Sequence, residues 1–458
     1  MKRISAFVAL SLFLISTTRA ELPTETGSWV SLFNGEDLAG WVPVNVAPST
    51  FTARDGMIIS TGKPTGVMRT ERMYENYIVE LEWRHMQPGG NAGLFLWGDG
   101  VPAVGIPFTR GIEVQILDND YNAKGKNEWF TTHGDIFPIH GAQMTPMGNI
   151  AKSGKRSFPT EELSKPSPEW NHYRVVANDG EVRLSVNGKE VTVGKDCVPR
   201  KGYIFLESEG AECHFRNLRI QELPSTGATI EETARDGEGF VPLYTGIDLE
   251  NWKVPEGDNG HWKVAGEVLD YDALSEAPGD KSLWSEREYE NFHLVADWRI
   301  KEAPYINPRV AQVLPDGSDA VDADGKPIAL SLPDSDSGIY LRGSSKYQVN
   351  IWCWPVGSGE MYGVRRDKNM PPEVRAAVTP RIKADNPVGK WNRFEITVQG
   401  EVVTVVLNGE TVLDKATIPG LPPRGAIALQ HHGSKKDGQW TSPPSLVQFR
   451  NIAIKELP

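Results

Sequence analysis

Two stretches of the chain decide its fold, Tyr74-Glu-Asn-Tyr-Ile-Val-Glu-Leu-Glu-Trp-Arg84 and Tyr289-Glu-Asn-Phe-His-Leu-Val-Ala-Asp-Trp-Arg299. They begin alike, with Tyr-Glu-Asn, and end alike, with Trp-Arg. From Tyr77 onward, polar and apolar residues alternate with a period of two, which predicts a β-strand with one face on a core. The same strand is therefore expected twice in one chain.

Five further blocks recur around these strands in the same order, which identifies an internal repeat. Residues 31–41 match 242–252, 91–98 match 336–343, 169–171 match 390–392, 186–188 match 407–409, and 214–224 match 448–458. Six blocks in one order do not arise by chance. The repeat predicts two domains of similar architecture.

The repeat also sets the expected boundaries. We predict a first domain at residues 21–224, a polar linker at 225–239 and a second domain at 240–458. The extra residues 303–333 in the second copy are expected to form a surface loop. A chain of this length is also too long for one compact core.

Turn signals support an all-β fold. Val186-Asn-Gly-Lys189 and Leu407-Asn-Gly-Glu410 are typical of tight hairpin turns, because both central residues must accept a positive φ. Strands are expected at residues 181–186 and 401–407, and one helical turn at 371–378. Short strands repeated over about 200 residues indicate an all-β, two-sheet sandwich or jelly roll in each copy.

The first twenty residues are typical of an export signal. Lys2 and Arg3 precede an apolar run, and small residues ending at Ala20 offer a cleavage site. The apolar run is too short to span a bilayer. We therefore predict an exported protein, periplasmic or extracellular, that does not insert into a membrane.

The charge of the chain excludes some partners. The formal net charge is −12, and it becomes −15 when Lys2, Arg3 and Arg19 leave with the signal. An acidic surface without a basic stripe argues against nucleic acid and anionic membranes. Neutral ligands such as sugars remain compatible.

The three cysteines do not form a metal-binding motif. Cys197 and Cys213 allow two interpretations, a disulfide bridge or two buried free thiols. Cys353 is then unpaired and is expected in the core.

The best candidate for a functional surface is the strand Gly111-Ile-Glu-Val-Gln-Ile-Leu-Asp118. Its alternation places Ile112, Val114 and Ile116 on the core and Glu113 and Gln115 on the opposite face. Such side chains suit sugar hydroxyl groups, although an ordinary solvated strand would show the same pattern. Asp118 is expected at the strand end.

A loop rich in functional residue types follows, Thr132-His-Gly-Asp-Ile-Phe-Pro-Ile-His140. Its His133, Asp135 and His140 offer a base, a proton donor or metal ligands. The spacing fits no common zinc motif, so a metal is the minority interpretation. Taken singly, each residue serves equally well to fix a long loop.

Aromatic residues lie in or beside these segments. Trp97 and Trp129 are candidates for stacking on a pyranose ring. Trp83, Trp298, Trp170 and Trp391 recur in both copies at strand-like positions, and we assign all four to the core.

The second copy departs from the first at the candidate strand. Its Tyr347-Gln-Val-Asn-Ile351 has Gln348 in place of Glu113 and Asn350 in place of Gln115. It has Leu429-Gln-His-His-Gly433 where the first copy has Leu206-Glu-Ser-Glu-Gly210, and Gly357-Ser-Gly-Glu-Met-Tyr-Gly363 replaces the histidine loop. Because amides are not bases, the first copy is the better catalytic candidate. Arg342, Gln348, Asn350, Glu360 and His431 are substrate-binding candidates, and Glu360 and His431 leave a second active site open.

The repeated blocks resemble the 3-keto-disaccharide hydrolase family. The resemblance rests on the Leu-Phe-Asn-Gly-Glu-Asp-Leu opening at residues 32–38, the strand 111–118, Glu169-Trp-Asn171 and the closing Phe-Arg-Asn blocks, and it covers both copies. It implies two concanavalin- or laminin-G-like sandwiches. It also implies a hydrolase or lyase acting on disaccharides or related glycosides already oxidised to a ketone at C3.

The chemistry implied by this resemblance is elimination. A C3 ketone acidifies the C2 proton, so a base removes that proton, the C1 substituent leaves, and water then adds. Such a site needs a base, a proton donor and a group that stabilises the enolate oxygen. We expect Glu113 or His140 as the base, with His133, Asp135 and Arg110 as donor, orienting or stabilising groups, and Gln115 and Asp118 as substrate contacts. No cofactor is certain, and a divalent cation at the enolate is compatible.

Two other classes of function compete with this one. A non-catalytic carbohydrate-binding protein would use the same sheet and aromatic residues without a titratable group in a closed site. An adhesion or scaffold protein would need no ligand site. An oligosaccharide or glycoside is the expected ligand, and the sequence does not decide the oligomeric state.

Overall fold

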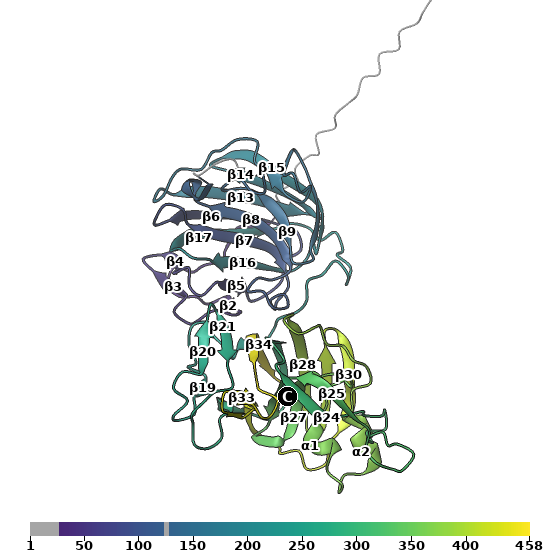
Figure 1. Ribbon diagram of the computed structural model, residues 1–458. Helices are drawn as coiled ribbons and strands as arrows, with labels where there is room; N and C mark the ends of the chain where they lie inside the picture. Colours follow the sequence, from purple (N-terminus) through teal and green to yellow (C-terminus); the bar gives the residue numbers. More distant parts are fainter. Residues whose placement is uncertain (1–26, 123–127) are drawn as a thin grey trace, which may run out of the picture.

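A computed structural model describes residues 27–122 and 128–458, and it shows an all-β protein built of two stacked units (Figure 1). The helical parts are short: α1 (Tyr362–Arg365), α2 (Pro372–Ala377), which confirms the predicted helical turn, and a 3-10 turn at Asn119–Asn122. Across the part of the chain described, no helix has the length and apolar character needed to cross a bilayer. The expected export signal lies outside the described residues.

The first unit consists of two antiparallel sheets packed face to face. The first sheet, sheet A, has the order β10 (Gln143–Pro146), β15 (Lys189–Val198), β14 (Glu181–Val186), β13 (Asn171–Asn178), β6 (Tyr77–His85), β17 (Cys213–Glu222), β4 (Met57–Ser60), β3 (Phe51–Arg54), with β1 (Val30–Ser31) also on β17. The second, sheet B, has the order β11 (Asn149–Ile150), β12 (Ser157–Phe158), β9 (Ile136–Ile139), β8 (Gly111–Leu117), β7 (Asn91–Gly98), β16 (Tyr203–Ser208), β5 (Gly66–Thr70), β2 (Trp41–Pro43). Sheet B carries the candidate strand at its centre.

The second unit repeats this arrangement. Its larger sheet has the order β20 (Trp262–Ala265), β21 (Val268–Tyr271), β34 (Val447–Glu456), β23 (Phe292–Ile300), β28 (Asn392–Gln399), β29 (Val402–Leu407), β30 (Glu410–Thr417), with β18 (Val241–Pro242) on β34. Its smaller sheet has the order β19 (Trp252–Lys253), β22 (Leu283–Tyr289), β31 (Gly425–Leu429), β26 (Asp336–Leu341), β27 (Ser344–Trp352). Residues 303–333 carry most of a hairpin, β24 (Tyr305–Ala311) with β25 (Ala329–Asp334), and a second small hairpin joins β32 (Lys435–Lys436) and β33 (Gln439–Trp440).

Period-two alternation produces the two cores. On β6 the side chains of Tyr77, Val79, Leu81 and Trp83 all enter the core of the first unit. Trp298 occupies the equivalent place in the second core. Burial of large apolar side chains of this kind contributes roughly 1.5–3 kcal/mol each to the free energy of folding.

The predicted hairpin turns are confirmed. Asn187 and Asn408 have φ of 48° and 52°, and each is followed by a glycine with positive φ. Asparagine tolerates this left-handed conformation better than other residues with a side chain. Cys197 and Cys213 are two buried free thiols and do not form a disulfide bridge, which decides between the two interpretations. Cys353 is a partly buried free thiol.

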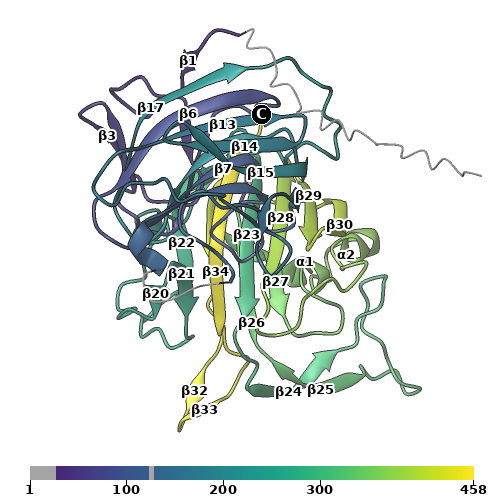
Figure 2. The ribbon, with the colours of Figure 1, turned by 90° about the horizontal axis from the view of Figure 1, so that it is seen from above.

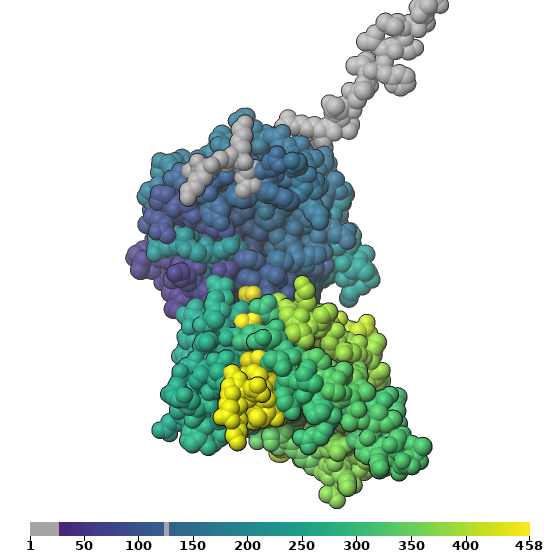
Figure 3. Space-filling view, in the orientation of Figure 1, coloured from purple at the N-terminus to yellow at the C-terminus, as the bar shows by residue number. Residues whose placement is uncertain are grey.

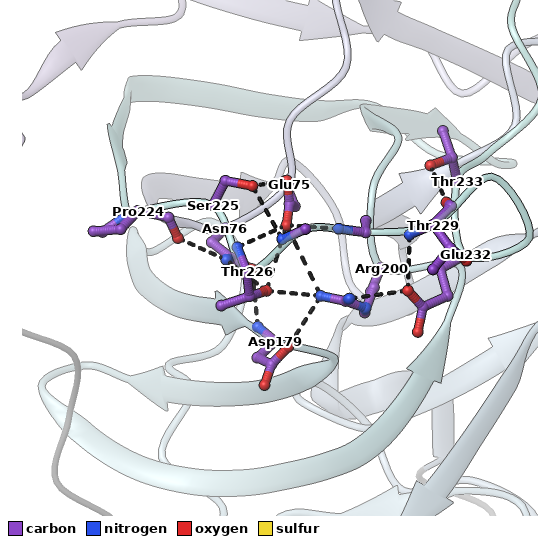
Figure 4. A network of polar contacts seen from close by, with 12 residues as sticks. Glu75, Asn76, Asp179, Arg200, Pro224, Ser225, Thr226, Thr229, Glu232 and Thr233 are labelled. Atoms are coloured by element: carbon purple, nitrogen blue, oxygen red, sulfur yellow. Dashed lines mark hydrogen bonds and ion pairs between the residues drawn. The ribbon is translucent and has the colours of Figure 1, made fainter.

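The segment between the units is fixed to the first of them, as Figure 4 shows. Glu75 accepts hydrogen bonds from the backbone of Thr226 and Ala228 and from the hydroxyl of Ser225. Arg200 donates to Thr226 at 2.7 Å and pairs with Glu232 at 2.9 Å. The segment predicted as a linker is therefore packed on the first domain over this part of its length.

The two units overlap when seen from above (Figure 2) and touch in the space-filling view (Figure 3). One contact is made by the loop of the first unit that follows β7. Gly105 donates its N–H to Asp297 at 2.8 Å and accepts a hydrogen bond from Arg450 at 2.9 Å. A Cβ on Gly105 would lie 2.2 Å from the ring of Trp391, so only glycine fits there. Trp391 and its counterpart Trp170 are half-buried and lie under arginine side chains, so their assignment to the core is wrong.

Candidate active site on the first sandwich

The candidate strand β8 has the predicted orientation. Ile112, Val114 and Ile116 enter the core, whereas Glu113 and Gln115 lie on the opposite face of sheet B, each 7% exposed. This face, which we call the site face, is largely shielded from solvent. A carboxylate in such surroundings is costly to ionise.

A second carboxylate, which the sequence did not single out, lies beside Glu113. Glu207 on β16 is 1% exposed, and its neighbour Leu206 pairs with Leu94 on the intervening strand β7. Between the two acids stands Gly93. A Cβ there would lie 2.9 Å from Oε2 of Glu207 and 3.1 Å from Oε1 of Glu113. The missing side chain at Gly93 lets the two carboxyl groups lean toward each other over β7.

Electrostatics couple the pair. Burial raises the pKa of Glu113 to about 8, against an opposing effect of Arg156 and with a further rise from Glu209 and Asp135. Burial also raises the pKa of Glu207 well above its ordinary value, and the charge of Glu113 raises it further. Two close acids in a dry site do not both ionise, so near neutral pH the pair retains at least one proton.

Asp135 joins this group from the loop before β9. It forms an ion pair of 3.1 Å with Arg156, and Thr131 donates to it through both its backbone and its hydroxyl. The guanidinium of Arg156 lies 3.4 Å from the ring centroid of Phe137, which stands directly opposite Glu113 on β9. Arg156 therefore places a positive charge beside the acidic pair.

A hydrogen-bonded chain continues the site face from Gln115. Its amide donates to Asn91 at 3.0 Å, and Asn91 donates to Glu209 at 2.5 Å. Asn91 begins β7, the strand beside β8, and Glu209 directly follows β16. The site face thus presents three glutamates, two amides, an aspartate and one arginine.

The structure does not bring His133 to this group. His133 is fully buried among Asn119, Thr132 and Ser164, and burial lowers its pKa to about 4. No hydrogen bond or ion pair between the described residues joins it to Glu113. Asp118 is likewise occupied, because it accepts N–H groups from Gly89, Asp120 and Ser167. Both residues fix loops here, and their expected catalytic and substrate-binding roles stay predictions.

His140 and Arg110 lie together at the other end of β8. The ring of His140 stacks on Phe108, and Phe108 contacts Phe95, which stands opposite Glu113 on β7. Arg110 is held by Asp99 through two bonds of 3.0 Å. The roles predicted for these residues, and for the 68% exposed Trp129, stay predictions.

Two predicted sugar contacts are wrong. Trp97 is 0% exposed and packs in the core, and Arg342 is 2% exposed and donates to the carbonyls of Gly400 and Pro422. Both have a positive φ, 53° and 49°, at an irregularity of the strand. This conformation turns the side chain to the face opposite the one that alternation predicts.

The second domain carries an equivalent face, with different chemistry. The amide of Gln348 donates to Gln430 at 2.6 Å, and these residues occupy the positions of Glu113 and Glu207. A glycine, Gly338, again stands between the two strands, and a Cβ there would lie 2.4 Å from Nε2 of Gln348. The acidic pair of the first domain is thus an amide pair in the second.

The rest of that face follows the same correspondence. Asn350 exchanges backbone hydrogen bonds with Glu360 and Gly359, as Gln115 does with Asp135 and Gly134. Glu360 is fully buried and paired with Arg365, and burial raises its pKa to about 7. The Gly357–Gly363 segment therefore replaces the histidine loop in space as well as in sequence. His431 points away, toward the hydroxyl of Tyr271, 2.7 Å distant.

No group of three or more His, Cys, Asp and Glu side chains is placed to hold a metal ion within residues 27–122 and 128–458. The divalent cation expected at the enolate therefore stays a prediction.

Comparison with known families identifies the repeated unit. The family described as 3-keto-alpha-glucoside-1,2-lyase-like domain matches residues 28–221 and again residues 239–455. The chain belongs to this family. Its two lyase-like domains coincide with the two stacked units, and the acidic pair lies in the first of them.

Three solved structures with similar folds illustrate the likeness, and each of them matches less than half of the chain. A proposed glycosyl hydrolase from Parabacteroides distasonis is 21% identical, with a TM-score of 0.34 over 43% of this chain and 94% of its own. A carbohydrate-binding module from Bacillus subtilis is 12% identical, with a TM-score of 0.29 over 40% and 96%. A β-glucanase from Bacillus licheniformis is 12% identical, with a TM-score of 0.27 over 44% and 100%. No curated protein matches the chain.

Proposed function

We propose that the first lyase-like domain cleaves 3-keto-glycosides by elimination and hydration, and that Glu113 and Glu207 carry the proton transfers. The observation that supports this is the buried acidic pair on either side of Gly93. Burial raises both pKa values, that of Glu113 to about 8, so as pH rises through this value Glu113 ionises while the charge it gains keeps the proton on Glu207. A base and an acid then stand side by side at one bound sugar ring.

The reaction follows from this arrangement. The ionised carboxylate takes the C2 proton, and the electrons of that bond delocalise onto the C3 oxygen. As the C1=C2 double bond forms, the C1–O bond breaks, and the leaving oxygen takes the proton of the other carboxyl group. Water then adds its hydroxyl to C1 and its proton to C2, so the net reaction is hydrolysis.

The enolate oxygen carries negative charge during this step. Arg156 is the cation beside the pair, and the amide of Gln115 is a neighbouring donor on the same face. Charge stabilisation of this kind in a water-poor site is often the largest contribution to catalysis. His140, at the other end of β8, is the remaining candidate for contact with the leaving group. With the export signal expected at residues 1–20, we expect the proposed reaction to take place outside the cytoplasm.

Incubation with 3-keto-disaccharides and with their unoxidised parents tests the proposal. We expect 3-keto-glucose from the oxidised substrates alone, with deuterium at C2 when the reaction runs in D2O. Glu113→Gln and Glu207→Gln should each reduce kcat by 10²- to 10⁴-fold, roughly the contribution of acid–base groups. Turnover in the presence of a chelator would show that no cation is needed.

A matched control is Glu80→Gln. Glu80 is also a buried glutamate, at 8% exposed, but it lies on sheet A and is paired with Arg219. Its replacement should leave kcat unchanged. Sugar binding without turnover of any keto-glycoside would instead make this domain a carbohydrate-binding module.

A further inference from the structure

The second domain has the same polar face as the first but lacks its acid–base pair. Gln348 and Gln430 remain neutral at every physiological pH, so they neither remove a C2 proton nor protonate a leaving oxygen. Their mutual hydrogen bond of 2.6 Å also leaves each amide with further hydrogen-bonding capacity. Such a face is suited to holding a ligand rather than to converting it.

The unpaired atoms on this face are acceptors. Oδ1 of Asn350 and Oδ1 of Asp336 are buried without a hydrogen-bond partner among the described residues, and Asn350 is 3% exposed. Oε2 of Glu360, next to Asn350 in the backbone pairing, is also without a partner. A buried acceptor left unpaired costs about 1–3 kcal/mol, so a ligand that donates hydrogen bonds here gains affinity.

This requirement separates two sugar classes. A hydroxyl group donates and accepts, whereas a ketone only accepts. An unoxidised sugar therefore satisfies Asn350 and Asp336 better than a sugar with a ketone at the same position. The first domain differs at the central pair, because Glu113 and Glu207 stand where the second domain has two amides, and the protonated acid of that pair donates to a ketone or enolate oxygen.

Accessible groups border the face. Asp336 faces His432 at 3.9 Å, and that imidazole side chain is 36% exposed. Trp284 on β22 and Tyr340 on β26 flank β31, with ring centroids 5.7 Å apart, and Trp284 is held by Asp280 through its indole N–H. An aromatic face beside hydroxyl-binding groups is typical of a sugar site.

We propose that the second domain is a binding site for unoxidised glycosides, which holds the saccharide without cleaving it. This inference depends on the proposed function in one respect only, namely that the ligand is a glycoside. It assigns the two repeats different tasks, proton transfer in the first and retention of the parent sugar in the second.

The full-length chain is tested by calorimetry with α- and β-linked glucose disaccharides. We expect binding of an unoxidised disaccharide that is weakened at least tenfold by Asn350→Leu and by Gln430→Leu. The thermal midpoints of these variants report whether the fold is intact. Equal binding by the chain and both variants would overturn the proposal.

A second arm tests whether the second domain is itself a catalyst. Glu113→Gln should abolish cleavage in the full chain. Cleavage that survives Glu113→Gln and is lost only on adding Asp336→Asn would overturn the proposal, because the Asp336–His432 pair would then be an acid–base pair. Failure of the unchanged chain to cleave any keto-glycoside, with sugar binding intact, would count against the proposed reaction and leave this site standing.

Discussion

Gln348 lies 2.6 Å from Gln430, in the position where the first domain has Glu113 and Glu207. Two amides satisfy each other there at no electrostatic cost. Two carboxyl groups in the same place resist ionisation, because burial and mutual repulsion both favour the protonated form. The first domain therefore holds an unfavourable pair of acids. The second domain shows that the same fold forms without such a pair. Strained or destabilising groups of this kind are typical of active sites.

The first prediction is that Glu207→Gln stabilises the protein above neutral pH. The pKa of Glu207 is raised in the folded state, so between its ordinary value and the raised one the folded protein binds more protons than the unfolded chain. The free energy of unfolding then falls as pH rises through that window. Replacing Glu207 by glutamine should raise the free energy of unfolding by about 1–2 kcal/mol at pH 8 and change it little at pH 4.

Urea unfolding at the two pH values measures this effect. Glu212→Gln is the control, because Glu212 is an exposed glutamate bound to His214 and should show no gain at pH 8. Destabilisation of Glu207→Gln at pH 8 would contradict the assignment of Glu207 as an acid that burial keeps protonated.

The second prediction concerns Gly93. Gly93→Ala would place a methyl group 2.9 Å from Glu207 and 2.8 Å from the ring of Phe95, so the acidic pair must shift. Misplacement on this scale typically costs about a hundredfold in rate. We expect kcat to fall to that extent while the thermal midpoint changes by only a few degrees. In Gly279→Ala the new methyl group meets nothing within 4 Å, so activity should be unchanged.

Most of the fold was predictable because it rests on local patterns. The repeat blocks, the period of two along β6 and β8 and the Asn-Gly turns all report on short stretches of chain. They correctly place Glu113 and Gln115 opposite the core. The sequence shows what one strand presents, but it does not show which strand lies beside it.

Glu207 was missed for this reason. It lies on β16, which follows Glu113 by more than ninety residues and reaches β8 only across β7. The signal that could have found it is the change of Leu-Glu-Ser-Glu-Gly to Leu-Gln-His-His-Gly between the repeats, since it matches the change of Glu113 to Gln348. The stacking role predicted for Trp97 is wrong for a different reason. The irregularity at the end of β7 reverses the alternation of side chains, and the sequence alone does not locate such an irregularity.

The third prediction follows from the buried position of Trp97. Trp97→Ala should destabilise the first domain by about 3–5 kcal/mol, the usual cost of a large cavity in a core. Its indole N–H also donates to the carbonyl of Glu75 at 2.7 Å, and that bond is lost. Thermal unfolding measures the loss. Weaker sugar binding without loss of stability would restore the stacking role.

The fourth prediction uses Arg156, whose charge lowers the pKa of Glu113 against the effect of burial. Arg156→Met should raise that pKa further, so the acidic limb of kcat/KM should move to higher pH by about one unit. Arg156→Lys keeps a charge and should hold the limb near its original pH, even if kcat falls. A limb that stays in place in Arg156→Met would mean that Glu113 does not set it.

The fifth prediction concerns the contact between the domains, where the two repeats give an internal control. Asn451 is 5% exposed and donates to Asp297 at 2.7 Å and to the carbonyl of Ile106 in the first domain at 2.8 Å. Its counterpart Asn217 has the same left-handed backbone, with φ of 54° against 49°, but is exposed. Asn451→Ala leaves a buried carbonyl and part of a buried carboxylate without their donor, which should cost about 2–4 kcal/mol.

The two alanine variants strain the left-handed backbone equally, so their difference isolates the contact between the domains. Calorimetry should show one transition for the unchanged chain and for Asn217→Ala. In Asn451→Ala the domains should begin to unfold separately, as a broadened or double transition. A single sharp transition in both variants would mean that the loop around Gly105 does not couple the domains. If coupling is lost, kcat on small keto-disaccharides should persist, because Glu113 and Glu207 both belong to the first domain.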